Sequence, residues 1–239
     1  MSKLTFIIVA FLFLTVCISA QNINNIFPLI SSLDEEDKLG LRGVAYNISQ
    51  PIVHFPTILQ GARVAIMASH CFEEVDLTFP YIYLTSRGAT VDIVGPSWTV
   101  DRKIVSCQYV RANRVVSINK TFKEAYLLQY DALFIAGGAW STATMRTDSD
   151  AISLIQKTYN YGNMIGTIDM SSSLLINAGL IKGKKVTGAP AIRQDLENAG
   201  AEYRDSTVVR SDLFIFSGRA PEDIAELTEA IAECIVGRH

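Results

Sequence analysis

The chain has 239 residues, of which 49% are hydrophobic, and its formal net charge is −3 at pH 7. This length and composition suit one globular domain with a sizeable core and some additional segments. The mild acidity argues against a general nucleic-acid-binding surface, which requires clustered basic residues.

The first 20 residues have the pattern of a secretory signal peptide. Lys3 precedes an apolar run from Leu4 to Val16, and a short segment then leads to Ala20. The run is shorter than the ~20 residues that span a membrane, so cleavage after Ala20 is the preferred interpretation and a membrane anchor is the alternative. We therefore predict a secreted protein, extracellular or in the lumen of the secretory pathway, that has no membrane segment after cleavage.

A secretory route has two further consequences. Cys71, Cys107 and Cys234 remain after cleavage, and this odd number leaves at least one thiol free or paired with another chain. The sequence does not fix the pairing. Asn47 and Asn119 each begin a glycosylation sequon and are candidate glycosylation sites, although such sequons also arise by chance.

The rest of the chain divides into an extension and a domain. Residues 21–60 are polar and irregular, and we predict an N-terminal extension there. Residues 61–237 are predicted to form the domain, in which apolar runs typical of buried strands alternate with helical segments. The predicted strands are 64–68, 90–94, 132–135, 164–168, 207–210 and 213–216, with a hairpin of 107–110 and 115–118, and the predicted helices are 75–87, 149–161, 172–178, 192–198 and 221–236.

This alternation predicts an α/β fold, a three-layer sandwich with a mostly parallel central sheet covered on both faces. Functional sites in such sheets lie beyond the carboxyl ends of the strands. Three of those ends have unusual sequences. They are the segment from Ser69 to Asp76, the run Ala136-Gly137-Gly138, and Asp169.

The last of these, at Asp169, is the most informative. An apolar strand from Met164 to Ile168 turns at Asp169 into a helix that opens on serines. A tight strand-to-helix corner lifts its side chain into a cleft and directs backbone N–H groups at the same point. Enzymes place a nucleophile on such a corner, whereas this chain has a carboxylate there.

Several segments, in order and at matching spacing, resemble the ThiJ/PfpI family. They are Phe72 to Asp76, Tyr130 to Gly138, Ala178 to Thr187, Asn198 to Tyr203 and Ser217 to Pro221, and the resemblance extends from about Arg63 to Ile235. It implies a class I glutamine amidotransferase-like, flavodoxin-like fold. Family members commonly dimerise, so the resemblance also implies a homodimer.

The chain departs from the family pattern where the chemistry resides. The position that matches the family's cysteine is Asp169, and the adjacent histidine position is Met170. In members whose histidine comes from a later segment, the matching position is about Ala189. The family's acidic residue falls on Asp76. The resemblance therefore implies that thiol-dependent hydrolase, deglycase and glyoxalase-like activities are absent, because neither the thiolate nor an aligned base remains.

Three interpretations of Asp169 stay open at this point. Asp169 caps the helix that follows, because aspartate caps well and tolerates left-handed backbone angles. Alternatively, Asp169 and Asp76 face each other across a pocket and share a proton or hold a cation or amine, because two close carboxylates do not both ionise without cost. In the third interpretation Asp169 is a nucleophile or general base, with the N–H groups of Gly138 and Met170 as oxyanion donors.

Other candidate residues carry less weight. His70 and Cys71 follow the first strand, but neighbouring side chains on a strand point to opposite faces, which favours a structural or disulfide role for Cys71. Trp140 follows the glycine turn and is expected to narrow the mouth of the pocket, while His70 is expected near it. The sequence has no spaced His/Cys cluster, so we predict neither a metal site nor a cofactor.

The preferred prediction is a secreted, non-catalytic binding or interaction protein with a degenerate active site. The alternative is a hydrolase or lyase that uses Asp169 as nucleophile or base and Asp76 as its proton partner. The sequence does not identify the ligand, which is a small molecule or a protein.

Overall fold

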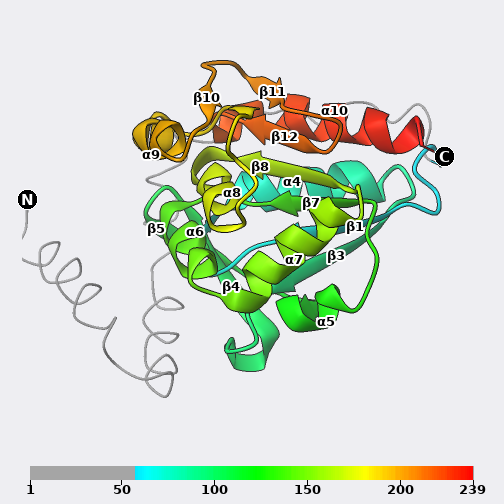
Figure 1. Cartoon of the computed structure of the whole chain (residues 1–239). Helices are drawn as coiled ribbons and strands as arrows, with labels where there is room; N and C mark the ends of the chain where they lie inside the picture. The colour runs from blue at the N-terminus through cyan, green and yellow to red at the C-terminus, as the bar shows by residue number, and fades with distance from the viewer. Residues whose placement is uncertain (1–56, 239) are drawn as a thin grey trace, which may run out of the picture. The chain divides into compact units, whose positions relative to one another are not determined.

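The computed structural model describes residues 57–238 (Figure 1). The predicted signal peptide, residues 21–56 of the predicted extension and the sequon at Asn47 lie outside these residues. No helix within 57–238 is long and apolar enough to cross a bilayer.

A seven-stranded sheet forms the centre of the domain, in the order β11-β12-β8-β7-β1-β3-β6. All neighbouring strands are parallel except β11 and β12. Because β1, β7 and β8 are adjacent and parallel, their carboxyl ends lie together, and the segments that follow them meet. The strands are β1 (Arg63–Met67), β3 (Thr90–Gly95), β6 (Lys120–Thr121), β7 (Ala132–Ile135), β8 (Met164–Ile168), β11 (Val208–Arg210) and β12 (Ile215–Gly218).

The sheet separates two hydrophobic clusters, one on each face. Val64 and Ile66 of β1 belong to the cluster formed with α4 (Glu74–Thr85) and α10 (Ile224–Val236). Ala65 and Met67 belong to the cluster on the other face. That cluster includes residues of α5 (Phe122–Tyr126), α6 (Ala139–Arg146), α7 (Ser149–Asn160), α8 (Leu174–Asn177) and α9 (Arg193–Asn198). Since successive side chains of a strand alternate between faces, the continuous apolar run of β1 serves both clusters. The predicted α/β fold is confirmed.

Two small sheets accompany the central one. The first has the order β2-β4-β5 and consists of β2 (Phe72–Glu73), β4 (Lys103–Gln108) and β5 (Arg111–Ser117). It contains the predicted hairpin, which is longer than expected and is joined to the loop after β1 through β2. The second pairs β9 (Lys185–Val186) with β10 (Glu202–Tyr203). Short 3-10 helices are η4 (Val100–Arg102), η5 (Asp169–Ser173), η6 (Pro190–Ile192) and η7 (Pro221–Asp223).

Candidate functional site

Asp169 lies at the corner between β8 and η5, as the sequence predicts. Its φ is 55°, in the left-handed region that aspartate enters more readily than most side chains. Its Oδ2 accepts a hydrogen bond from the N–H of Gly138 at 3.2 Å. The N–H of Met170 also donates to the carboxylate. The side chain is therefore held by its own segment and by the turn after β7.

These two N–H groups are the donors that the catalytic interpretation reserves for a developing oxyanion. An oxyanion site works when its donors are aimed at the position that the reacting oxygen will occupy. Here the donors of Gly138 and Met170 bind the carboxylate of Asp169 itself. The carboxylate thus occupies the space in which an oxyanion would be stabilised.

Asp76 lies in the first turn of α4 and is 1% exposed. Its Oδ2 accepts a hydrogen bond from the N–H of Gly137 at 2.9 Å. Its Oδ1 is buried and has no hydrogen-bond partner among the described residues. Two consecutive N–H groups of one turn, those of Gly137 and Gly138, therefore hold two carboxyl groups that come from different elements.

The structure brings Asp76 and Asp169 together around Gly137. A Cβ atom added at Gly137 would lie 2.6 Å from Oδ2 of Asp76 and 2.9 Å from Oδ2 of Asp169. Atoms this close overlap, so only glycine leaves room for both carboxyl groups. The two carboxyl groups thus lie beside the same glycine, while their sharing of a proton or of a ligand stays a prediction.

Burial and nearby negative charges raise the pKa of both groups. Burial and the negative charge of Asp169 raise the pKa of Asp76 well above its ordinary 3.8, against the opposing effect of the Gly137 N–H. Burial raises the pKa of Asp169, opposed by the N–H groups of Met170 and Gly138. The charged neighbours that act on the pair, which include Glu73 and Glu222, are all acidic. The pair therefore retains protons to a higher pH than isolated carboxyl groups do.

The raised pKa of Asp76 predicts a contribution to stability that is lost as the pH rises. A carboxyl group whose pKa is raised by folding contributes stability that is complete below its unfolded-state pKa and is lost as the pH rises through its folded-state pKa. For Asp76 this loss of stability therefore begins near pH 3.8, the ordinary pKa of the group, and continues toward higher pH. Asp76→Asn should remove this contribution, so that its urea midpoint of unfolding falls less than that of the wild type as the pH rises above about 4.

Asp148→Asn is the matched control for this prediction, because asparagine retains the helix cap that Asp148 provides for α7. The control should keep the wild-type slope. An unchanged pH slope in Asp76→Asn would show that ionisation of Asp76 has no cost in the folded protein.

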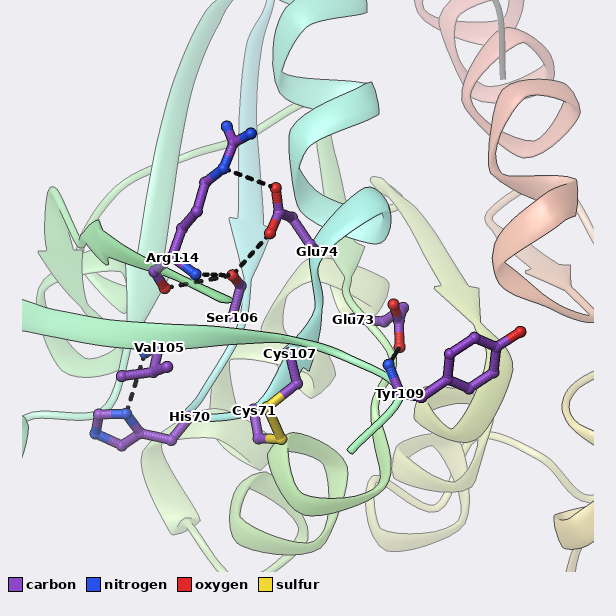
Figure 2. Close-up of a disulfide and its surroundings, with 9 residues drawn as sticks. All are labelled: His70, Cys71, Glu73, Glu74, Val105, Ser106, Cys107, Tyr109 and Arg114. Atoms are coloured by element: carbon purple, nitrogen blue, oxygen red, sulfur yellow. Dashed lines mark hydrogen bonds and ion pairs between the residues drawn. A yellow bond between two sulfur atoms is a disulfide. The ribbon is translucent and has the colours of Figure 1, made fainter. Parts of the chain in front are cut away.

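His70 does not form a catalytic pair with Cys71. Its Nδ1 accepts a hydrogen bond from the N–H of Val105 at 3.2 Å (Figure 2). Its ring centroid lies 5.5 Å from that of Trp98. Burial lowers the pKa of His70, which favours the neutral imidazole that this bond requires. His70 therefore fastens the loop to β4.

The cysteine pairing that the sequence leaves open is Cys71 with Cys107 (Figure 2). The disulfide agrees with the role favoured for Cys71. Cys234 lies in α10, outside any disulfide, and packs against the hydrophobic cluster on that face. Nothing in the spacing of the three cysteines distinguishes these partners, because the contact depends on how β2 pairs with β4.

The remaining predicted residues lie near the turn or on the surface. Trp140 is in the first turn of α6 and is 48% exposed. Met170 is partly exposed and packs against a hydrophobic cluster. Asn119 is exposed, and its Oδ1 accepts a hydrogen bond from the N–H of Ile93 at 2.7 Å, while its glycosylation stays a prediction. Within residues 57–238 no three or more His, Cys, Asp or Glu side chains form a potential metal site.

The serines after the corner are structural. The hydroxyl of Ser171 accepts a hydrogen bond from the N–H of Ile168 at 2.8 Å and lies 2.8 Å from the carbonyl oxygen of Ile135. The hydroxyls of Ser172 and Thr167 bond to each other at 2.9 Å. All three side chains are buried, and these bonds fix the corner.

Comparison with known proteins identifies the family. The model of the DJ-1/PfpI family matches residues 62–234. The deglycase PH1704 of Pyrococcus horikoshii is 29% identical over 162 residues, which are 68% of this chain and 92% of that protein.

Solved structures agree with this assignment. A two-domain protein of Anabaena variabilis with DJ-1/ThiJ/PfpI-like and ferritin-like domains aligns with a TM-score of 0.67 and 28% identity. The alignment covers 72% of this chain and 47% of that one. Drosophila melanogaster DJ-1beta has the same fold, with a TM-score of 0.67, 20% identity and coverage of 74% and 91%. The resemblance inferred from the sequence motifs is thus confirmed, and the chain belongs to the DJ-1/PfpI family.

Proposed function

We propose that this protein binds a ligand or partner and does not perform thiol-dependent chemistry such as that of the deglycases it is similar to. One observation carries the proposal. The corner that presents a nucleophile in enzymes holds the carboxylate of Asp169, and the N–H groups of Gly138 and Met170 are bonded to that carboxylate. A carboxylate is a far weaker nucleophile than a thiolate, and here its donors stabilise it instead of a reacting oxygen.

The other described residues supply neither a thiol nor an imidazole at the corner. Cys71 and Cys107 are joined in a disulfide, and Cys234 lies in α10. The only histidine within residues 57–238 is His70, whose Nδ1 is bonded to the backbone of β4. Neither component of a cysteine–histidine pair is thus present at the corner in the part of the chain that the structure describes.

A hydrolase or lyase that uses Asp169 with Asp76 as its proton partner is the second candidate. The raised pKa values of the two carboxyl groups favour it, because perturbed acids of this kind concentrate at functional sites. The occupied N–H donors oppose it, since a carbonyl substrate would have to displace Asp169 from them.

Secretion is also part of the proposal. The Cys71–Cys107 disulfide supports it, because disulfides persist chiefly in oxidising compartments. A homodimer, implied by the family resemblance, stays a prediction.

The function is tested by comparing the wild type, Asp169→Ala and Asp195→Ala on glycated amines, 2-oxoaldehydes, esters and peptides. Asp195 is an exposed carboxylate in α9 and serves as the matched control. We expect no turnover above the buffer rate with any of the three proteins, because the site has no activated nucleophile. Turnover by the wild type and Asp195→Ala that is lost in Asp169→Ala would instead establish the aspartate-dependent enzyme.

A further inference from the structure

We propose that the Cys71–Cys107 disulfide is a redox-sensitive latch. In the oxidised protein the disulfide keeps the loop of residues 69–73 in contact with the Gly137–Gly138 turn. Its reduction weakens the hydrogen bond from the N–H of Gly138 to the carboxylate of Asp169. The latch regulates ligand binding at the Asp76–Asp169 site, and its biological role therefore rests on the proposed function.

Hydrogen bonds and the disulfide fasten the loop to β4 and to Tyr109, the residue after it (Figure 2). The N–H of Cys71 donates to the carbonyl oxygen of Val105 at 2.7 Å, and the N–H of Val105 donates to His70. The N–H of Tyr109 donates to Oε2 of Glu73 at 3.0 Å. The paired strand β2 is only 2 residues long. The disulfide adds a covalent bond to this attachment.

The same loop lies directly against the turn that holds Asp169. The N–H of Glu73 donates to the carbonyl oxygen of Gly137 at 3.4 Å. A Cβ atom added at Gly138 would lie 2.5 Å from the carbonyl oxygen of Cys71 and 3.0 Å from Cα of Phe72. The disulfide is therefore connected to Asp169 in two steps. The backbone of Cys71 contacts Gly138, and the N–H of Gly138 donates to the carboxylate of Asp169.

The backbone of Cys71 provides the reason for movement. Its φ is 56°, in the left-handed region that side chains other than those of Gly, Asn and Asp seldom adopt. Such a conformation persists only where the surroundings over-determine it. Once the sulfur–sulfur bond is broken, we expect Cys71 to relax toward extended angles and to carry its carbonyl oxygen away from Gly138.

The rest of the hairpin should stay attached, which keeps the change local. Glu74, the first residue of α4, accepts a hydrogen bond from the hydroxyl of Ser106 at 3.0 Å (Figure 2). It also forms an ion pair with Arg114 of β5 at 3.1 Å. These contacts join both strands of the hairpin to α4 independently of the disulfide.

Opening of the latch requires a dithiol reductant. Cys71 is partly exposed and Cys107 is 4% exposed, so the external thiolate attacks the sulfur of Cys71. The sulfur–sulfur bond breaks, and Cys107 leaves as a thiolate that takes up a proton. The second thiol of the reductant then attacks the mixed disulfide and releases Cys71. Two electrons and two protons pass to the protein, and the reductant becomes a disulfide.

Hydrogen exchange measured by mass spectrometry tests the latch on the intact protein, oxidised or treated with dithiothreitol, with alkylation confirming complete reduction. We expect the amides of residues 136–142 to exchange about tenfold faster after reduction, at labelling times short enough that global unfolding contributes no exchange. Under those conditions the amides of α7 and α10 should change less than about twofold. Cys234→Ser under the same treatment should respond like the wild type.

Two double variants distinguish relaxation of the Cys71 backbone from loss of the sulfur–sulfur bond itself. Cys71→Ala with Cys107→Ala should show the fast exchange without reductant. Cys71→Gly with Cys107→Ala should show less of it, because glycine keeps a positive φ without strain. Unchanged exchange at 136–142 after reduction overturns the latch, as does an equal rise in α7 and α10, which would mean global loosening. None of these readings depends on turnover, so they stand apart from the test of the proposed function.

Discussion

Replacing both Cys71 and Cys107 by serine is expected to lower the free energy of unfolding by about 4 kcal/mol. The disulfide joins residues separated by 36 positions, and a closed loop of this length removes substantial conformational entropy from the unfolded chain. For a domain of this size the loss corresponds to a fall in the melting temperature of roughly 10 °C. Urea and thermal unfolding, followed by circular dichroism, measure both quantities.

Cys234→Ser is the control for that experiment, since Cys234 forms no disulfide. It should shift the free energy of unfolding by less than about 1 kcal/mol, because only one partly buried side chain changes and no disulfide is lost. Equal stability of the double serine variant and the wild type would mean that the non-covalent contacts of the loop suffice.

Gly138→Ala should destabilise the protein by about 3 kcal/mol, from overpacking together with backbone strain. Gly138 has a φ of 88°, and its added Cβ would meet the backbone of Cys71, Phe72 and Glu73 at 2.5, 3.0 and 2.9 Å. Backbone atoms cannot rotate aside as a flexible side chain does. The substitution should also displace the N–H that holds Asp169, which would appear as a change in the Asp169 carboxyl titration by NMR.

Gly183→Ala, measured in the same way, distinguishes the cost of backbone strain from the cost of steric overlap. Gly183 has a φ of 74°, but an added Cβ there meets nothing within 4 Å. This variant should cost only about 1–2 kcal/mol, the penalty of a left-handed alanine. Equal losses at the two glycines would show that the loop yields freely at Gly138.

The sequence is sufficient to locate the central strands and the corner. Ala132–Ile135 and Met164–Ile168 are predicted with the bounds that the structure has, because each is a short run of buried residues between polar or turn residues. The strand order follows less directly, since it depends on how helices return the chain to the sheet. The position of Asp169 at the end of β8 needs only the local transition from strand to helix.

Elements with weak local patterns could not be predicted. The helix α6 was expected only as a turn at Gly137-Gly138, because its residues Trp140 to Thr144 include three polar side chains and little helical periodicity. Two of them, Ser141 and Thr142, are buried in the fold. The predicted helix over 172–178 begins instead as η5 at Asp169, since the serine hydroxyls bond back to the nearby chain.

The contacts that define the candidate site are long-range. The bond from Gly138 to Asp169 joins residues 31 positions apart, and that from Gly137 to Asp76 joins residues 61 apart. No local pattern encodes which N–H meets which carboxylate. The motif resemblance predicts both acids at one place, but the bond between Asp169 and the donors is evident only in the folded structure.

The carboxylate at 169 also bears on oxidative folding. Asp169 and Cys71 both contact Gly138, so a thiol at the corner would stand close to the disulfide. Thiols exchange with neighbouring disulfides through mixed intermediates, whereas a carboxylate takes no part in such exchange. With aspartate there, Cys234 is the one competing thiol within residues 57–238, and it lies in the last helix. Among the described residues, pairing of Cys71 with Cys107 thus meets a single competing thiol as the chain folds.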